Sequence, residues 1–372
     1  MTRPYQICSR CVMDTSDPDI DFDNDGVCTH CRSYGRMIRD IHMSENERKL
    51  LLQKTVEKIK RQGSSCQYDC VIGLSGGVDS TYTAYLVKNM GMRPLAVHLD
   101  NGWDTEIAVS NIEKTVKRLN IDLYTHVIDW TEFRDMQLSY FKASVADIEV
   151  LTDHAIWAVL YRQAARHGIK YIINGANVTS EFILPLSWIS DKNDLRNIKA
   201  IQQRFGTQKI KTFPTLGFLK LNCYKYIQNI KVFMILDYVD YIKKDAIKII
   251  ENELDWRNYG GKHHESFFTK FFQAYILPEK FKIDKRRAHL STLICSKQIT
   301  REAALDELKK ASYNSEELKE DTDYIIKKLG ITGNEFNEIM KMPLKKYTDY
   351  PSYHNNISYI MCRFLFRKLK GI

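Results

Sequence analysis

The stretch that decides the fold spans residues 68–80 and reads YDCVIGLSGGVDS. Its first part is a short apolar run that predicts a buried strand, and a helical stretch follows from Ser80 to Asn89. The glycines between them let backbone N–H groups approach an anion, and the start of the helix adds partial positive charge. Asp79 stands where a Walker A motif needs lysine, and the GxGxxG spacing of dinucleotide folds is missing. We therefore expect a phosphate-binding turn of another kind.

Further strands and helices alternate on the C-terminal side of this turn. Apolar runs at 94–99, 123–128 and 171–173 predict strands, and the periodic segments 105–119 and 153–167 predict helices. This alternation is typical of βαβ units and predicts an α/β fold with a parallel sheet. After Pro214 the strand signal fades, and residues 223–254 and 302–328 are mostly helical by period.

The length of 372 residues allows two or three domains. We expect a cysteine ribbon over residues 1–35 and a helical linker over 36–66, in which Ser44 and Glu47 form a capping box. An α/β domain that contains the phosphate-binding turn is expected over 67–213, and a mainly helical region that binds substrate or partner over 214–372.

Four of the nine cysteines form two CxxC pairs, Cys8 with Cys11 and Cys28 with Cys31, which are separated by sixteen residues. Two such turns complete a tetrahedron of thiolates, so the spacing predicts a structural zinc site. An iron–sulfur cluster and unconnected buried thiols remain alternatives. The segment 21–26 begins like a calcium loop, but its twelfth position would be Arg32 instead of glutamate, so we interpret 24–26 as a hairpin turn.

The composition indicates a soluble protein that keeps its thiols reduced. The wholly apolar runs, such as residues 232–236, are far shorter than the roughly 20 residues that a membrane-spanning helix needs, and the N-terminus lacks the apolar core of a signal peptide. We therefore expect a cytoplasmic location. The net charge of +9 is compatible with an anionic partner and equally with a solvated surface.

The hexapeptide 75–80 resembles the pyrophosphate loop of the ATP-pyrophosphatase (PP-loop) superfamily, whose members cleave ATP between the α and β phosphates and transfer AMP to a substrate oxygen. The resemblance implies an adenine-nucleotide-hydrolase-like domain. Asp79 would help to hold Mg²⁺, and Asn174-Gly175-Ala176-Asn177 would close over the phosphates although it lacks the histidine of relatives. The remaining implied ATP contacts are Ser75, Gly76, Gly77 and Ser80 at the phosphates and Asp100 and Asn101 at the adenosine.

Segments 7–14, 255–266, 275–278 and 283–291 resemble the bacterial N-acetyl sugar amidotransferases of surface-polysaccharide biosynthesis. Arginine and lysine in these segments suit a sugar diphosphate or carboxylate, and the two histidines suit an acetamido group or proton transfer. The implied substrate contacts are Arg257, Lys262, His263, His264, Glu265, Lys285, Arg286 and Arg287. The implied catalytic residues are Asp79, Ser80, Lys262 and His263. A solvated helix face remains the alternative for 285–287, and one of the adjacent histidines is expected to point away. Phe268 excludes an HExxH zinc motif.

This resemblance implies an AMP-forming ligase that uses ATP, Mg²⁺ and a structural Zn²⁺. The acetamido oxygen of a nucleotide-linked or sialic-acid-like N-acetyl sugar would be adenylated, and ammonia would displace AMP to give an acetamidino group for O-antigen, capsule or flagellin glycan. Thr2 excludes an N-terminal nucleophile glutaminase, so ammonia would come from a partner glutaminase with a cyclase-like channel subunit. The positive charge then maps partly to this site and no longer argues for nucleic acid.

Two other functions remain open. A PP-loop tRNA thiolase also combines this loop with CxxC pairs, but it needs a reactive cysteine or an iron–sulfur cluster beside ATP, and Cys66, Cys70, Cys223, Cys295 and Cys362 form no further CxxC pair. A zinc scaffold that binds nucleotide without turnover is the third hypothesis.

Overall fold

The structure, a computed structural model, describes residues 4–40, 43–260, 265–357 and 359–361. Its centre is a parallel sheet of five strands in the order β3-β2-β1-β4-β5. The strands are β1 (Cys70–Gly73), β2 (Pro94–Asp100), β3 (Asp122–Val127), β4 (Tyr171–Asn174) and β5 (Lys231–Met234). The predicted α/β class with a parallel sheet is confirmed.

The sheet is buried on both faces because apolar residues occupy both sides of its central strands. In β1, Val71 belongs to one core cluster, whereas Cys70 and Ile72 belong to the other. Likewise Leu95 of β2 faces the first core and Ala96 the second. Side chains of a strand alternate between its faces, so a strand that is covered on both sides appears in the sequence as a continuous apolar run.

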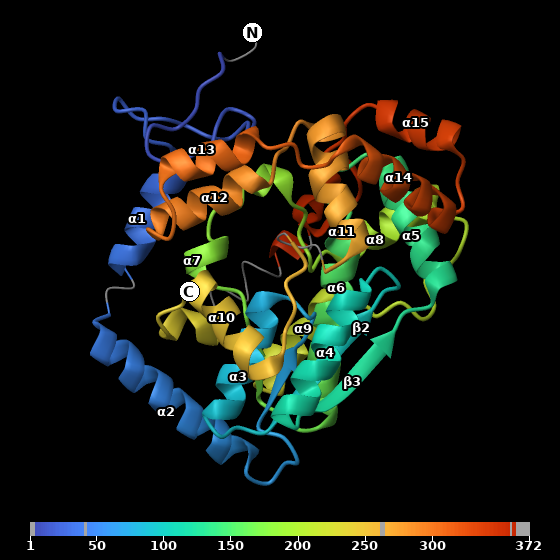
Figure 1. Ribbon diagram of the computed structural model, residues 1–372. Coiled ribbons are helices and arrows are strands. Elements are labelled where there is room, and N and C mark those ends of the chain that lie inside the picture. The colour runs from blue at the N-terminus through green and yellow to red at the C-terminus, as the bar shows by residue number, and fades with distance from the viewer. Residues whose placement is uncertain (1–3, 41–42, 261–264, 358, 362–372) are drawn as a thin grey trace.

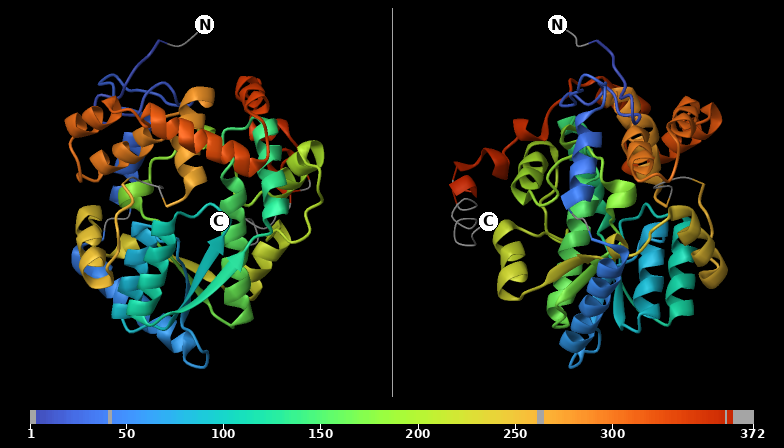
Figure 2. Two further views of the ribbon diagram at one scale, coloured as in Figure 1. Left: turned by 45° about the vertical axis from the view of Figure 1, so that its right-hand side comes forward. Right: turned by 90° about the vertical axis from the view of Figure 1, so that its left-hand side faces the viewer.

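Helices from distant parts of the chain cover the two faces (Figures 1 and 2). The second core joins the sheet to α2 (Glu45–Gly63), α3 (Val78–Asn89), α4 (Glu106–Leu119) and α10 (Lys243–Leu254). The first core joins it to α5 (Trp130–Ala143), α6 (Val150–Arg166) and α8 (Leu195–Phe205). The capping box predicted for Ser44 and Glu47 is present at the start of α2.

The C-terminal helices lie beyond the carboxyl ends of the strands, beside the N-terminal ribbon (Figure 1). The ribbon ends in α1 (Thr29–Asp40). The C-terminal elements are α11 (Phe267–Phe271), the π-helix η4 (Phe272–Phe281), α12 (Arg286–Cys295), α13 (Arg301–Lys309), α14 (Ser315–Leu329), α15 (Gly333–Lys341), η5 (Tyr347–Asp349) and η6 (Tyr353–Asn355). Among the described residues, no helix has the length and apolar character needed to cross a membrane.

Short elements connect the sheet to its surroundings, and one of them departs from the sequence prediction. They are α7 (Val178–Glu181), η1 (Leu186–Trp188), α9 (Phe218–Asn222), the π-helix η2 (Cys223–Ile227) and η3 (Ile235–Tyr238). The prediction of a mostly helical segment over 223–254 is wrong at β5, which pairs with β4 from Tyr171↔Lys231 to Asn174↔Met234. The sheet therefore continues beyond the boundary expected at residue 213.

Candidate active site at the carboxyl edge of the sheet

The loop between β1 and α3 occupies the point where the strand order reverses. β1 lies between β2 and β4, so the crossover connections on its two sides run in opposite directions and leave a crevice outside its carboxyl end. Ligands of open α/β sheets bind in such crevices. The loop thus lies where the topology favours binding.

The loop turns tightly against the neighbouring helix α4. Gly76 has φ +78°, and a Cβ on it would lie 2.5 Å from the carbonyl oxygen of Ala108. The Gly76 carbonyl accepts a hydrogen bond from the Trp256 indole nitrogen at 2.9 Å. Only glycine fits this conformation and this spacing without strain.

The start of α3 presents backbone donors at the end of the loop. The N-cap residue Gly77 has no side chain to cap these N–H groups, and the Tyr259 hydroxyl accepts a hydrogen bond from the Val78 backbone. The Ser80 hydroxyl donates to the Gly77 carbonyl at 3.1 Å and accepts from the Ser75 amide at 3.2 Å. These bonds join the two ends of the loop, and the Gly77 amide donates to the Ser75 hydroxyl at 3.4 Å.

A cavity of about 440 Å³ extends from this loop, within the size range of ligand pockets. The sequence-predicted residues that line it are Ser75, Gly77, Asp79, Ser80, Asn101, Gly175, Glu265 and Lys285. The described residues among the predictions that do not line it are Gly76, Asp100, Asn177, Arg257, Arg286 and Arg287. Lys262, His263 and His264 lie outside the described residues.

Two carboxylates and two tyrosines lie around the loop at the start of α3. The Tyr241 hydroxyl donates to Asp79 Oδ1, and burial together with the Asp79 charge raises the pKa of Tyr241. A Cβ on Gly77 would lie 3.3 Å from the Tyr259 hydroxyl and 3.4 Å from Glu265 Oε1, so both side chains reach over the loop. Mg²⁺ is usually bound by one or two carboxylates together with phosphate oxygens of a substrate. Asp79 and Glu265 lie beside the loop and therefore fit this ion.

The ends of β2 and β4 bring further polar groups to the same edge. Asn101 donates to the Thr152 hydroxyl at 3.1 Å on the cavity wall, whereas Asp100 accepts from the Gly102 amide at 2.8 Å. Gly175 comes so close to α3 that a Cβ would lie 2.8 Å from the Asp79 carbonyl oxygen. Asn177 is buried and caps α7 by accepting from the Ser180 amide at 2.8 Å, which gives it a local structural contact.

His98 is a cavity residue that the sequence prediction missed. Its Nδ1 lies 3.0 Å from the Leu74 carbonyl oxygen, and its Nε2 lies 3.2 Å from Asp104 Oδ2. Burial disfavours the imidazolium, but the hydrogen bond and charge of Asp104 outweigh burial and raise the pKa of His98. In the sequence, His98 stands within an apolar strand and Asp104 in the loop after β2. No motif therefore indicated that these two residues form a pair.

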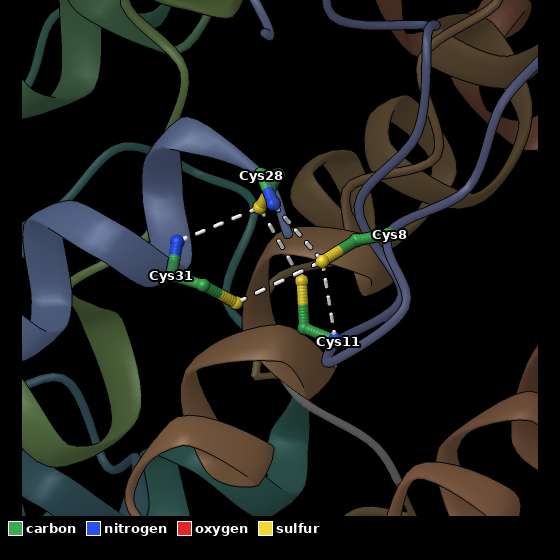
Figure 3. A group of neighbouring side chains, drawn as sticks. All are labelled: Cys8, Cys11, Cys28 and Cys31. Carbon is green, nitrogen blue, oxygen red and sulfur yellow. Dashed lines mark hydrogen bonds between the residues drawn. The ribbon is translucent and has the colours of Figure 1, made fainter. Parts of the chain in front are cut away.

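The four N-terminal cysteines converge on one point in the ribbon (Figure 3). Their sulfurs lie within 4.8 Å of one another, with 3.7 Å between Cys11 and Cys28 and 4.0 Å between Cys8 and Cys31. A tetrahedron with Zn–S bonds near 2.3 Å has sulfurs about 3.8 Å apart. The cysteine positions therefore fit a four-thiolate zinc site, with all four residues buried.

Backbone amides support the negative charge that such a site needs. The amides of Arg10, Cys11 and Cys28 donate to the Cys8 sulfur at 3.3–3.4 Å. Hydrogen bonds from the neighbouring thiols, that of Cys11 first, lower the pKa of Cys8. Cys295 of α12 places a fifth sulfur 3.6 Å from Cys31, which brings the ribbon into contact with the C-terminal helices.

Residues 265–365 match the family model for the C-terminal domain of WbpG-like lipopolysaccharide (LPS) biosynthesis proteins. We refer to this matched segment as the WbpG-like domain, after the model to which it is similar. It starts at Glu265, the carboxylate that reaches over the loop, and it supplies one wall of the cavity with Ser266, Thr269, Gln273 and Lys285.

No curated protein sequence matches the chain. Among solved structures, an NMN synthetase from Francisella tularensis is similar at 14% identity with a TM-score of 0.34, covering 82% of this chain and 98% of that one. An NH₃-dependent NAD synthetase from Campylobacter jejuni is similar at 18% identity with a TM-score of 0.30, covering 56% and 84%. A predicted tRNA methyltransferase subunit from Methanocaldococcus jannaschii has 16% identity and a TM-score of 0.28, covering 48% and 74%.

The WbpG-like domain is joined to the strand ends by backbone pairing. The Thr105 amide donates to the Glu265 carbonyl and the Phe267 amide to the Trp103 carbonyl, each at 2.9 Å. These bonds form an antiparallel bridge between Asp104 and Ser266. They fix the first residues of the domain beside His98 and the loop.

The three basic residues predicted at 285–287 point to three different partners. Lys285 lies 3.6 Å from Glu149 in the cavity wall. Arg286 pairs with Asp284 and donates to the Lys310 carbonyl at 2.9 Å, and Arg287 pairs with Asp14 of the ribbon at 3.0 Å.

The two arginines therefore have internal partners away from the cavity, which corrects their expected place beside the substrate. Arg257 is exposed, and its backbone pairs with Asn111 in both directions at 2.8 Å. We do not propose these three arginines as substrate contacts.

The ribbon is clamped to the WbpG-like domain by hydrogen bonds to its backbone. Arg301 donates to the carbonyls of Cys8 and Cys11 at 2.9 and 3.0 Å, and Arg287 donates to the Val12 carbonyl at 2.9 Å. The four-cysteine ribbon thus contacts the helices α12 and α13, and Lys285 precedes α12 directly.

Proposed function

We propose that this chain is an ATP-dependent N-acetyl sugar amidotransferase of LPS or related surface-glycan biosynthesis. One observation carries the proposal: a single cavity has the phosphate-type loop as one wall and the WbpG-like domain as the other. ATP and a sugar would therefore meet between the two. The ATP-cleaving part would be the α/β sheet with its helices, and the domain from residue 265 onwards would select the sugar.

The proposed chemistry makes the oxygen of an unreactive amide into a leaving group. The acetamido oxygen attacks the α-phosphorus of ATP, the bond to the β-phosphate oxygen breaks, and pyrophosphate leaves. Ammonia then attacks the imidate carbon, loses a proton, and AMP departs with the former amide oxygen. The product carries an acetamidino group.

The chain's own groups have clear tasks in this scheme. Loop amides and the Ser75 and Ser80 hydroxyls would hold the phosphates that become pyrophosphate, where preorganised donors stabilise developing charge. Asp79 and Glu265 would hold Mg²⁺, which neutralises charge on the phosphates when bound. His98, whose pKa is raised by the hydrogen bond and charge of Asp104, would place an imidazole group in the wall of the same cavity.

The PP-loop tRNA thiolase is less well supported. Such an enzyme needs a reactive thiol or an iron–sulfur cluster beside ATP, and among the described residues no cysteine lines the cavity. Cys70, which is closest to the loop in sequence, is fully buried in β1, and burial raises the pKa of its thiol.

We also propose that ammonia comes from a partner glutaminase through a cyclase-like subunit.

The test combines the chain with ATP, Mg²⁺, ammonium and a panel of nucleotide-linked and sialic-acid-like N-acetyl sugars. We expect AMP and an amidino product in equal amounts with at least one sugar. Asp79→Asn should lower the rate by about 100-fold or more, because a charge-stabilising group is lost. Asp306→Asn, on exposed helix α13, is the matched control. A panel without AMP refutes the proposal and favours the non-catalytic scaffold, and an unaffected rate in Asp79→Asn refutes the role given to Asp79.

A further inference from the structure

Three polar side chains from three elements meet on the cavity wall contributed partly by the WbpG-like domain. Glu149 precedes α6, Gln273 lies in the π-helix η4, and Lys285 precedes α12. All three line the same cavity as the loop. π-helical segments are rare and frequently accompany functional sites.

Glu149 organises the other two residues through one oxygen atom. Gln273 Nε2 donates to Glu149 Oε2 at 2.9 Å, and Lys285 Nζ lies 3.6 Å from the same atom. The side chains of Glu149 and Lys285 are only 14% and 15% exposed. The carboxylate therefore fixes the side chains of both neighbours and cancels the charge of the lysine.

The three side chains offer both acceptors and donors to a ligand. Because its nitrogen donates to Glu149, Gln273 has its carbonyl oxygen as an acceptor, Glu149 has a second oxygen, and the Lys285 ammonium supplies N–H donors. A secondary amide needs this combination, since its N–H requires an acceptor and its C=O a donor. An anion would instead meet the Glu149 carboxylate and a lysine that is already neutralised.

From this geometry we propose that Glu149, Gln273 and Lys285 form a subsite for an acetamido group of the substrate. The inference deepens the function proposed above and rests on it. It also changes the expectation for Lys285: this lysine holds a neutral amide group and does not bind a diphosphate or a sugar carboxylate. Gln273 and Glu149 become specificity-determining residues of the site.

Two near-isosteric variants test the subsite. Gln273→Met removes the acceptor, and Glu149→Gln removes the charge that neutralises Lys285. Gln53→Met and Glu57→Gln, both exposed on α2, are matched controls for the same chemical changes. The probes are UDP-N-acetylglucosamine, UDP-glucose and UDP-glucuronate, and affinity is measured by saturation-transfer NMR on the intact chain without turnover.

We expect the unmodified protein to prefer the acetamido probe to UDP-glucose. Gln273→Met should weaken binding of the acetamido probe by about fivefold or more, as expected for one lost hydrogen bond, and should change UDP-glucose binding little. Glu149→Gln should improve binding of UDP-glucuronate relative to the acetamido probe, because Lys285 is then unneutralised.

Equal effects of Gln273→Met on the acetamido and glucose probes would overturn the subsite, and so would no saturation transfer to the acetamido methyl group. Failure of the proposed function looks different. Selective acetamido binding without AMP formation would retain the subsite and refute the amidotransferase. AMP and amidine formation, with unchanged selectivity among the probes in both variants, would retain the amidotransferase and refute the subsite.

Discussion

The close approach of the loop to α4 makes a quantitative prediction for Gly76→Ala. Alanine at φ +78° adopts a left-handed conformation that costs about 1–2 kcal/mol. Its Cβ would also lie 2.5 Å from the Ala108 carbonyl oxygen and 3.1 Å from two further backbone atoms of that residue. Backbone of a helix cannot rotate away, so this overpacking costs about 1–3 kcal/mol more. The expected loss of unfolding free energy is about 2–5 kcal/mol.

Gly260→Ala separates the two contributions. Gly260 has φ +87°, but a Cβ there would meet no atom of the described residues within 4 Å. This variant should therefore lose only the conformational cost, about 1–2 kcal/mol. Urea unfolding of both variants, followed by tryptophan fluorescence, measures the difference, and calorimetric titration with ATP should show weaker binding to Gly76→Ala alone. Equal destabilisation of the two variants would refute the close contact between loop and α4.

Three further predictions follow from the site. In Gly175→Ala, the new Cβ would meet the Asp79 carbonyl oxygen at 2.8 Å and displace the catalytic centre. Steady-state rates of AMP formation should therefore fall by about tenfold or more. Because folding raises the pKa of His98, the protonated form of this residue stabilises the fold. The contribution is fully present below the pKa of about 6.5 in the unfolded chain and is lost as pH rises through the pKa in the folded protein. His98→Gln should thus be destabilising at pH 5.5 and less so at pH 9 in urea unfolding, whereas a pH-independent loss would exclude the Asp104 pair. A chelator should release one zinc per chain and lower the melting temperature, and Cys28→Ser should be isolated without metal; metal retention by that variant would contradict the four-thiolate site.

Local signals in the sequence predicted the loop between β1 and α3 and the convergence of the four N-terminal cysteines. The hexapeptide 75–80 and the CxxC pairs combine a short spacing with a specific chemical demand, so a few residues suffice to define each. The strands next to the loop were also predictable, because burial on both faces produces continuous apolar runs such as that of β2.

The fifth strand gave a weaker signal for a physical reason. β5 has four residues at the edge of the sheet, and among them only Phe233 is buried. The π-helix η2 precedes it closely, so the periodicity around it resembles a helix. Pairing with β4, which sequence periodicity does not contain, decides its conformation.

The walls of the cavity depend on contacts between distant segments. Gln273 meets Glu149 across 124 positions of the chain, and Arg287 meets Asp14 from the ribbon. A run of basic residues in a sequence does not say which member faces an internal carboxylate and which faces a ligand. Lys285 lines the cavity and Arg287 does not, because α12 packs on the ribbon.

The central claim is that this cavity transfers AMP to an amide oxygen, and isotope transfer tests it most directly. An N-acetyl sugar substrate with ¹⁸O in its acetamido carbonyl is incubated with the chain, ATP, Mg²⁺ and [¹⁵N]ammonium, and both products are analysed by mass spectrometry. The account predicts one ¹⁸O in every AMP and one ¹⁵N in every amidino product. AMP without ¹⁸O, formed at the same rate with or without the sugar, would contradict it.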